Sequence, residues 1–166
     1  MVRVFAVVLI VLMLFSGCSN GAKLETVADV YDVSVSSPIR NVAITLPEGA
    51  AQAVLASDNG DSFYVCDGFT VSVSTLAGGD LIRTVREVTG FEKTALTVMT
   101  TTENGTKRHT CAWTSLGEGT EQICKTVILD DGYSHYAVTV MCDYEAAWEL
   151  AQEMNSVLDS ATLHTA

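Results

Sequence analysis

Hydrophobic and polar residues alternate in short runs along most of the chain, which is typical of strands that bury one face. In the first half of the chain these runs are 33–36, 42–46, 63–65 and 69–73. The last two stand on either side of Asp67-Gly68, a pair that suits a hairpin turn or a bulged continuation. The pattern therefore predicts a β-sheet, in which Pro47-Glu48-Gly49 stops the second strand.

Four further β-rich runs lie between residues 93 and 142, and compact turn signals separate them. The signals are Glu103-Asn104-Gly105, Gly117-Glu118-Gly119 and Asp130-Asp131-Gly132. They predict an antiparallel meander, because Asn, Asp and Gly tolerate the positive φ angles that tight turns need. With turns centred on these signals, one face of the meander would carry Cys111, Trp113, Cys124, Ile128, Tyr136, Val138, Val140 and Cys142.

In two segments the hydrophobic residues are spaced with the period of an α-helix. The first begins after Asp80, a good N-cap, and ends at Gly90, where a C-terminal glycine belongs. The second follows Asp143, also expected to be an N-cap. Its apolar stripe consists of Ala147, Leu150, Ala151, Met154, Val157 and Leu158. We expect this last helix to lie across the meander.

The chain begins like a bacterial lipoprotein precursor. Arg3 precedes a run of twelve apolar residues, 4–15, and Ser16-Gly17-Cys18 follows. A membrane-spanning helix needs about 20 residues, so the run predicts a signal peptide ending at a small-residue cleavage site. Cys18 would become the first mature residue and carry the lipid. Plain secretion and an uncleaved anchor are the alternatives.

The predicted organisation is a signal peptide at 1–17, a lipid-anchored tether at 18–30, one α/β domain at 31–163 and a short tail at 164–166. The mature length of 149 residues suits a single domain. Removal of Arg3 leaves eight basic residues against twenty acidic ones and a net charge of −12. Nucleic acid is therefore excluded as a partner, and neutral or cationic partners are favoured. The local basic group Lys107-Arg108-His109 is interpreted as solvated strand residues.

Four cysteines remain after Cys18, and an even number in an exported domain favours disulfides. A turn at Gly117-Glu118-Gly119 would place Cys111 opposite Cys124, which predicts a bridge between them. Cys66 and Cys142 would then pair by elimination. Buried free thiols are the alternative.

No sequence motif for catalysis or metal binding is present. The chain lacks a nucleophile elbow, a phosphate loop, a His-Glu-x-x-His pair and an EF-hand spacing. Asp130-Asp131 is explained by a turn, and no histidine has a partner that the sequence identifies. We therefore expect no catalytic residue, no metal and no cofactor. Trp148, at the edge of the last helical stripe, is the candidate binding residue, with partial burial in the core as the alternative.

The ordered set of elements resembles the Mog1/PsbP-like α/β/α sandwich over about residues 31–163. The resemblance is carried by the strand leading into Leu46-Pro47-Glu48-Gly49, by the meander, and by the closing helix that ends Val157-Leu158-Asp159-Ser160. It implies a single α+β domain with a mainly antiparallel sheet. It also implies a binding or assembly role, because members of that family mostly act in this way. It transfers no functional residue to this chain, and the four cysteines are a departure from it.

Together these features predict a lipid-anchored protein on the extracytoplasmic face of the bacterial cell envelope. Its partner would be an envelope protein or a small ligand. An envelope enzyme with an unrecognised site and a purely structural envelope component are the alternatives.

Overall fold

The computed structural model describes residues 40–53, 61–117 and 119–165, all within one compact unit, Pro38–Ala166. The predicted leader, Cys18, the tether and the strand at 33–36 lie outside the described residues. Among the described residues, no helix is both long enough and apolar enough to cross a membrane.

A seven-stranded antiparallel sheet forms the centre of this unit. In spatial order its strands are β2 (Ala51–Ala53), β3 (Ser62–Val65), β4 (Phe69–Ala77), β8 (Ser134–Asp143), β7 (Thr120–Asp130), β6 (Thr106–Gly117) and β5 (Met99–Glu103). The predicted meander is confirmed as β5 to β8, and the predicted hairpin at Asp67-Gly68 joins β3 to β4.

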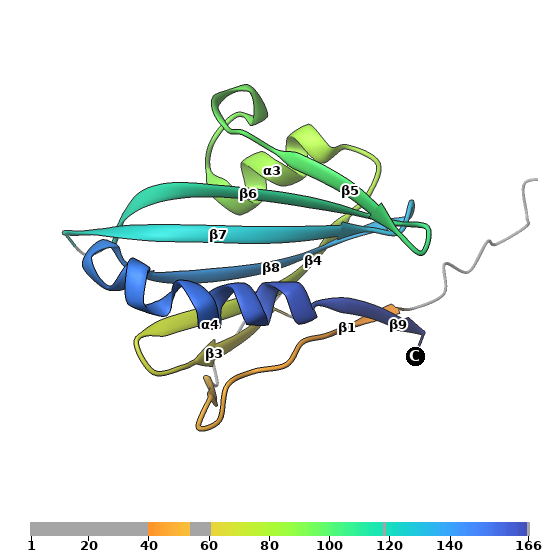
Figure 1. Ribbon diagram of the computed structural model, residues 1–166. Coiled ribbons are helices and arrows are strands. Elements are labelled where there is room, and N and C mark those ends of the chain that lie inside the picture. Colours follow the sequence, from red (N-terminus) through yellow and green to blue (C-terminus); the bar gives the residue numbers. More distant parts are fainter. Residues whose placement is uncertain (1–39, 54–60, 118, 166) are drawn as a thin grey trace, which may run out of the picture. The chain divides into compact units, whose positions relative to one another are not determined.

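Two helices, α3 (Leu81–Thr89) and α4 (Ala147–Ser160), cover opposite faces of this sheet (Figure 1). The core beneath α4 includes Val71, Val127, Val138, Val140, Met154 and Leu158. The core beneath α3 includes Val85, Ile128 and Ala137. Successive residues of a strand point to opposite faces, so β7 and β8 contribute to both cores. The result is a single α+β domain, an α/β/α sandwich, as predicted.

Short elements complete the domain. The 3-10 turns η1 (Lys93–Ala95) and η2 (Tyr144–Ala146) precede β5 and α4. β1 (Arg40–Ala43) and β9 (Thr162–Thr165) form a separate two-stranded antiparallel sheet. The tail predicted at 164–166 is therefore wrong for His164, which pairs with Asn41 in this sheet.

The predicted ends of α3 are confirmed, and the predicted start of α4 is not. The Asp80 side chain accepts hydrogen bonds from the backbone N–H groups of Ile82 and Arg83, and Gly90 ends α3 in the left-handed conformation at φ 76°. Asp143 makes no such bond, because η2 intervenes and α4 begins only at Ala147. The residues directly after Asp143, Tyr144–Ala146, form the 3-10 turn instead of the first turn of α4.

The register of β6 against β7 differs by two residues from the predicted one. Gly117 pairs with Thr120, so the loop contains only positions 118 and 119. Cys111 therefore lies opposite Thr126, and Cys124 lies opposite Trp113. Diagonal neighbours have Cβ atoms about 7 Å apart, whereas a disulfide needs about 4 Å. The predicted Cys111–Cys124 bridge is wrong.

The same register separates the residues that were expected to share one face of the meander. The even-numbered residues of β8 from Tyr136 to Cys142 face α4, as predicted. Cys111, Trp113, Cys124 and Ile128 belong instead to the face that α3 covers.

Arg108 fastens the end of α4 to the sheet. Its side chain is only 17% exposed, and its guanidinium donates to the backbone carbonyls of Leu158 and Ala161, the latter at 3.0 Å. The last carbonyls of a helix have no partner within the helix, and the helix dipole favours a cation there. The interpretation of Lys107-Arg108-His109 as solvated residues is wrong for Arg108 and for His109, which is 5% exposed.

Ser160, the last residue of α4, connects the helix to the segment that leads into Leu46-Pro47. Ser160 Oγ donates to the Val157 carbonyl at 2.7 Å and accepts from the Thr45 backbone N–H at 2.8 Å. Thr45 immediately precedes Leu46-Pro47, so the end of the last helix holds the extended segment that enters this turn. A hydrogen bond of this kind contributes about 1 kcal/mol.

Candidate functional site

Trp148 lies on the outer side of α4 and is 92% exposed, so the alternative that places it partly in the core is wrong. The core-facing stripe of α4 is formed by its neighbours, with Ala147 and Leu150 partly buried and Met154, Val157 and Leu158 buried. Consecutive residues of a helix point about 100° apart, so the burial of Ala147 turns Trp148 toward solvent.

Two other exposed hydrophobic side chains occur at the end of the molecule where α4 begins. Leu116, near the tip of the β6–β7 hairpin, is 84% exposed, and Tyr144 of η2 is 54% exposed. The two elements meet because η2 contacts β7 and because Asp143, just before η2, pairs with Gln122 of β7 (Figure 1). We call Leu116, Tyr144 and Trp148 the Trp148 surface.

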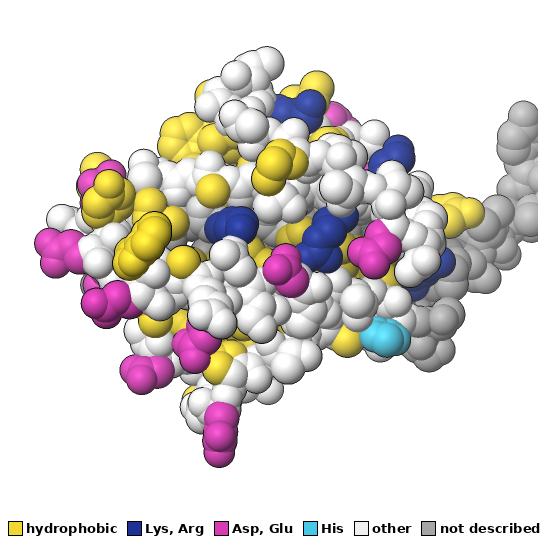
Figure 2. Space-filling view, in the orientation of Figure 1, with side chains coloured by type: hydrophobic (Ala, Val, Ile, Leu, Met, Phe, Trp, Pro, Cys, Tyr) yellow, Lys and Arg dark blue, Asp and Glu magenta, His cyan; other side chains and the backbone are white. Residues whose placement is uncertain are grey.

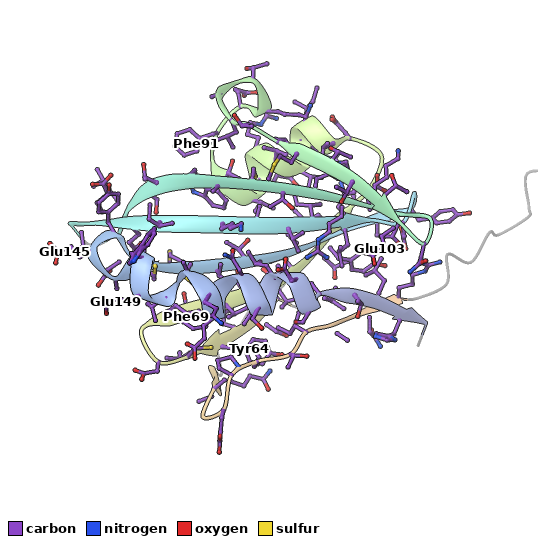
Figure 3. All side chains as sticks on the ribbon, in the orientation of Figure 1. Tyr64, Phe69, Phe91, Glu103, Glu145 and Glu149 are labelled. Carbon is purple, nitrogen blue, oxygen red and sulfur yellow. The ribbon has the colours of Figure 1, made fainter. Side chains whose placement is uncertain are left out.

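Acidic side chains surround the Trp148 surface. Those exposed at this end are Glu121, Asp143, Glu145 and Glu149. Residues 109–124 and 141–160 contain no Lys or Arg. Figure 2 shows acidic and hydrophobic side chains together where α4 begins, and Figure 3 shows Glu145 and Glu149 pointing away from the body there, with Phe69 beneath the helix. The Trp148 surface is thus an apolar patch in a strongly negative field.

A second candidate site is a buried polar cluster on the α3 face of the sheet. Asp130 Oδ2 lies 3.7 Å from His135 Nε2 and 3.8 Å from His109 Nε2. Each imidazole is held from its other side by a threonine hydroxyl: His135 Nδ1 lies 2.6 Å from Thr84 Oγ1, and His109 Nδ1 lies 2.8 Å from Thr100 Oγ1. The cluster thereby connects α3, β5, β6, β7 and β8.

A pocket of about 310 Å³ adjoins the cluster, with Lys107, Leu81, Gly79 and Gly132 in its walls. His109 Nε2 is buried there without a hydrogen-bond partner among the described residues. Burial lowers the pKa of His109, Asp130 opposes this shift, and His135 and Lys107 add to it. The arrangement can exchange a proton or bind a small polar group.

The hairpin registers contained a signal for this cluster. It was missed in the sequence because each histidine was considered alone, without its cross-strand neighbours. His135 pairs directly with Asp130 across the turn at Asp131-Gly132, and His109 lies diagonally from Asp130 on β6. Both relationships follow from hairpin registers. His109 can be identified as a neighbour of Asp130 only when the β6–β7 loop is known to consist of positions 118 and 119.

The paired aspartates also stabilise their turn, as predicted. Asp130 Oδ1 accepts from the Gly132 N–H at 2.7 Å, and Asp131 Oδ1 accepts from the Tyr133 and Ser134 N–H groups. No group of three or more His, Cys, Asp or Glu in the described part of the chain is arranged to hold a metal ion.

The four cysteines of the domain are buried free thiols. Burial raises the pKa of each thiol, and Glu153 adds to the effect at Cys66. A raised pKa disfavours the reactive thiolate, which argues against a nucleophilic cysteine. Cys66 and Cys142 belong to one core cluster.

The comparisons with known proteins identify the fold. The cyanobacterial PsbP protein, CyanoP, of Synechocystis sp. PCC 6803 matches 79% of this chain and 96% of its own length, with 11% identity and a TM-score of 0.51. The Ran-binding protein Mog1p of Saccharomyces cerevisiae matches 78% of this chain and 96% of its own length, with 10% identity and a TM-score of 0.50. The domain therefore has the Mog1/PsbP-like fold.

Two further structures are similar at lower scores. LpqN of Mycobacterium tuberculosis, described as involved in cell envelope biogenesis, matches 78% of this chain and 87% of its own, with 12% identity and a TM-score of 0.45. A Bacteroides thetaiotaomicron protein matches 75% of this chain at 12% identity and a TM-score of 0.49, and this chain spans only 45% of that protein. At these scores neither adds to the assignment. No protein-family model and no curated protein sequence matches the chain.

The buried His109 predicts a pH-dependent stability. The pKa of His109 is lowered in the folded state. At pH values just below 6.5, the ordinary pKa, His109 therefore takes up a proton in the unfolded chain but stays neutral in the folded chain. The free energy of unfolding should therefore fall as the pH drops from 7 toward 5.5, by at most about 1.4 kcal/mol per pH unit for this group. Asp130, His135 and Lys107 are the charged or titratable groups that act on it.

Urea unfolding at several pH values measures this effect. The slope of the free energy of unfolding against pH should flatten in His109→Gln. It should persist in the control His164→Gln, because the side chain of His164 is exposed. An unchanged slope in His109→Gln would contradict the assignment.

Proposed function

We propose that this chain is a lipid-anchored envelope protein that binds a protein partner through the Trp148 surface and catalyses no reaction. The observation that carries the proposal is the 92% exposure of Trp148 at the same end of the domain as the exposed Leu116 and Tyr144. Exposed apolar side chains that cluster often mark a contact surface, and tryptophan and tyrosine are enriched among residues that dominate binding energy.

The charge around this surface favours a cationic partner. The acidic rim attracts Lys and Arg side chains, and the indole face of Trp148 also binds such cations. The same rim repels anionic lipid headgroups, so membrane attachment would depend on the lipid at Cys18. A protein segment that carries Lys or Arg beside an apolar side chain satisfies both features.

An envelope enzyme is the second candidate, and the His109–Asp130–His135 cluster beside its pocket favours it. The cluster offers imidazoles for proton transfer, yet no activated nucleophile lies among its described members. Reproducible turnover of an envelope substrate, lost in Asp130→Asn, would overturn the non-catalytic proposal. A purely structural component would differ from both by having no saturable partner.

The anchoring proposal rests on Arg3, the apolar run and Cys18. Cys18→Ala should abolish labelling with radioactive or alkyne fatty acid and move the protein out of the detergent phase, because the thiol that accepts the lipid is gone. Cys66→Ala is the matched control and should leave labelling unchanged. Labelled Cys18→Ala protein would contradict the lipoprotein assignment.

The binding proposal predicts that Trp148→Ala weakens partner binding without destabilising the fold. The side chain contributes little to the core, so the free energy of unfolding should change by less than about 0.5 kcal/mol. Affinity for a partner captured from detergent-solubilised envelope and then purified should fall about 30-fold or more, equivalent to about 2 kcal/mol.

Tyr133→Ala is the control for this experiment. Tyr133 is an exposed aromatic residue, 57% accessible, in the β7–β8 turn, away from the Trp148 surface. It should leave the affinity unchanged. Equal affinity of Trp148→Ala and the unaltered protein would contradict the assignment of the contact surface.

A further inference from the structure

Among the described residues, the sheet ends at β5, and no further strand pairs with the outer side of this strand. This strand is the last in the seven-stranded order and pairs only with β6 within that sheet. All five of its residues, Met99-Thr100-Thr101-Thr102-Glu103, are exposed, and Met99 is 63% exposed. The opposite edge, β2, has only three residues. An edge strand presents a row of backbone N–H and C=O groups that another strand can pair with.

β5 lacks the features that usually keep such an edge from pairing. It contains no Lys, Arg or Pro, and no residue with positive φ interrupts it before Asn104 in the following turn. Threonine, which makes up its centre, has a high preference for strands. Short length protects β2, and β5 has no comparable protection in the part of the chain that the structure describes.

We propose that β5 pairs antiparallel with β5 of a second copy of this chain, forming a symmetric dimer with one continuous sheet. In the centred register Thr101 lies opposite Thr101 of the other copy, and Thr100 lies opposite Thr102. Met99 lies opposite Glu103, the one charged residue of the strand. The strand is thus self-complementary, because threonines meet threonines and no like charges meet.

This register also preserves the two faces of the sandwich. Met99, Thr101 and Glu103 point to one face, and Thr100, which contacts His109 on the α3 side, points to the other with Thr102. Each opposed pair in the dimer therefore belongs to the same face of the sheet. The edge buries much less than the roughly 800 Å² per partner of a standard interface, so the dimer should be weak, with a dissociation constant in the micromolar to millimolar range.

Charge changes at Met99 test this register. Sedimentation equilibrium of the purified chain, from micromolar to about millimolar concentration, gives the dimer dissociation constant. Met99→Lys places a cation opposite Glu103 twice per dimer and should tighten association about fivefold, whereas Met99→Glu should weaken it about fivefold. Within one chain Met99 faces the uncharged Thr110, so both variants should fold equally well.

Two further measurements complete the test. The double variant Met99→Glu with Glu103→Lys should restore dimerisation, and Gln152→Lys, at an exposed position of α4 and on no strand edge, should leave it unchanged. The difference between Met99→Lys and Met99→Glu should shrink in 1 M salt, where the screening length is about 3 Å. A protein that stays monomeric at about millimolar concentration, or equal dissociation constants for the two Met99 variants, would overturn the proposal.

Discussion

The guanidinium group of Arg108 holds the C-terminal end of α4 against the sheet, and the arrangement of one whole layer depends on it. It donates to the carbonyl of Ala161, the residue just after the helix, and to that of Leu158, which also accepts from the Ala161 backbone N–H. Next to it, Ser160 bonds the Val157 carbonyl and the Thr45 N–H, so the extended segment before Leu46 is fixed to the same point. These polar contacts hold α4 over the apolar core that contains Met154, Val157 and Leu158.

A helix fixed in this way has one face committed to the core, and the opposite face defines the surface of the molecule. Trp148 is exposed because Ala147 and Leu150 occupy the core side of the first turns of α4. The acidic residues around it have no basic neighbours in the adjoining sequence, so this end carries negative charge, which supports the cationic partner that we propose. The unpaired edge at β5 is a separate surface, formed by backbone rather than by side chains.

Local sequence signals predicted the elements well because each depends on a few neighbouring residues. Alternation and turn signals identified β3 to β8, Asp80 and Gly90 marked the ends of α3, and the apolar stripe identified α4, whereas β2 and β9 were not predicted. The β6–β7 register was missed because Gly117, Glu118 and Gly119 permit more than one turn, and a shift of the turn centre by one residue moves the pairing by two. That shift decides whether Cys111 meets Cys124 and whether His109 approaches Asp130. Arg108 gave no local signal, because its partners lie 50 and 53 residues further along the chain.

Hydrogen–deuterium exchange of α4 in Arg108→Ala tests this account most directly. Loss of the guanidinium removes two charge-assisted hydrogen bonds at the end of α4, at a cost of about 1–3 kcal/mol. Amides in 147–160 should then exchange about tenfold or more faster, while those of α3 change little. Arg86→Ala, which removes an exposed guanidinium from α3, is the control and should leave α4 unchanged. Exchange of α4 at the same rate in Arg108→Ala and the unaltered protein would contradict the role assigned to Arg108.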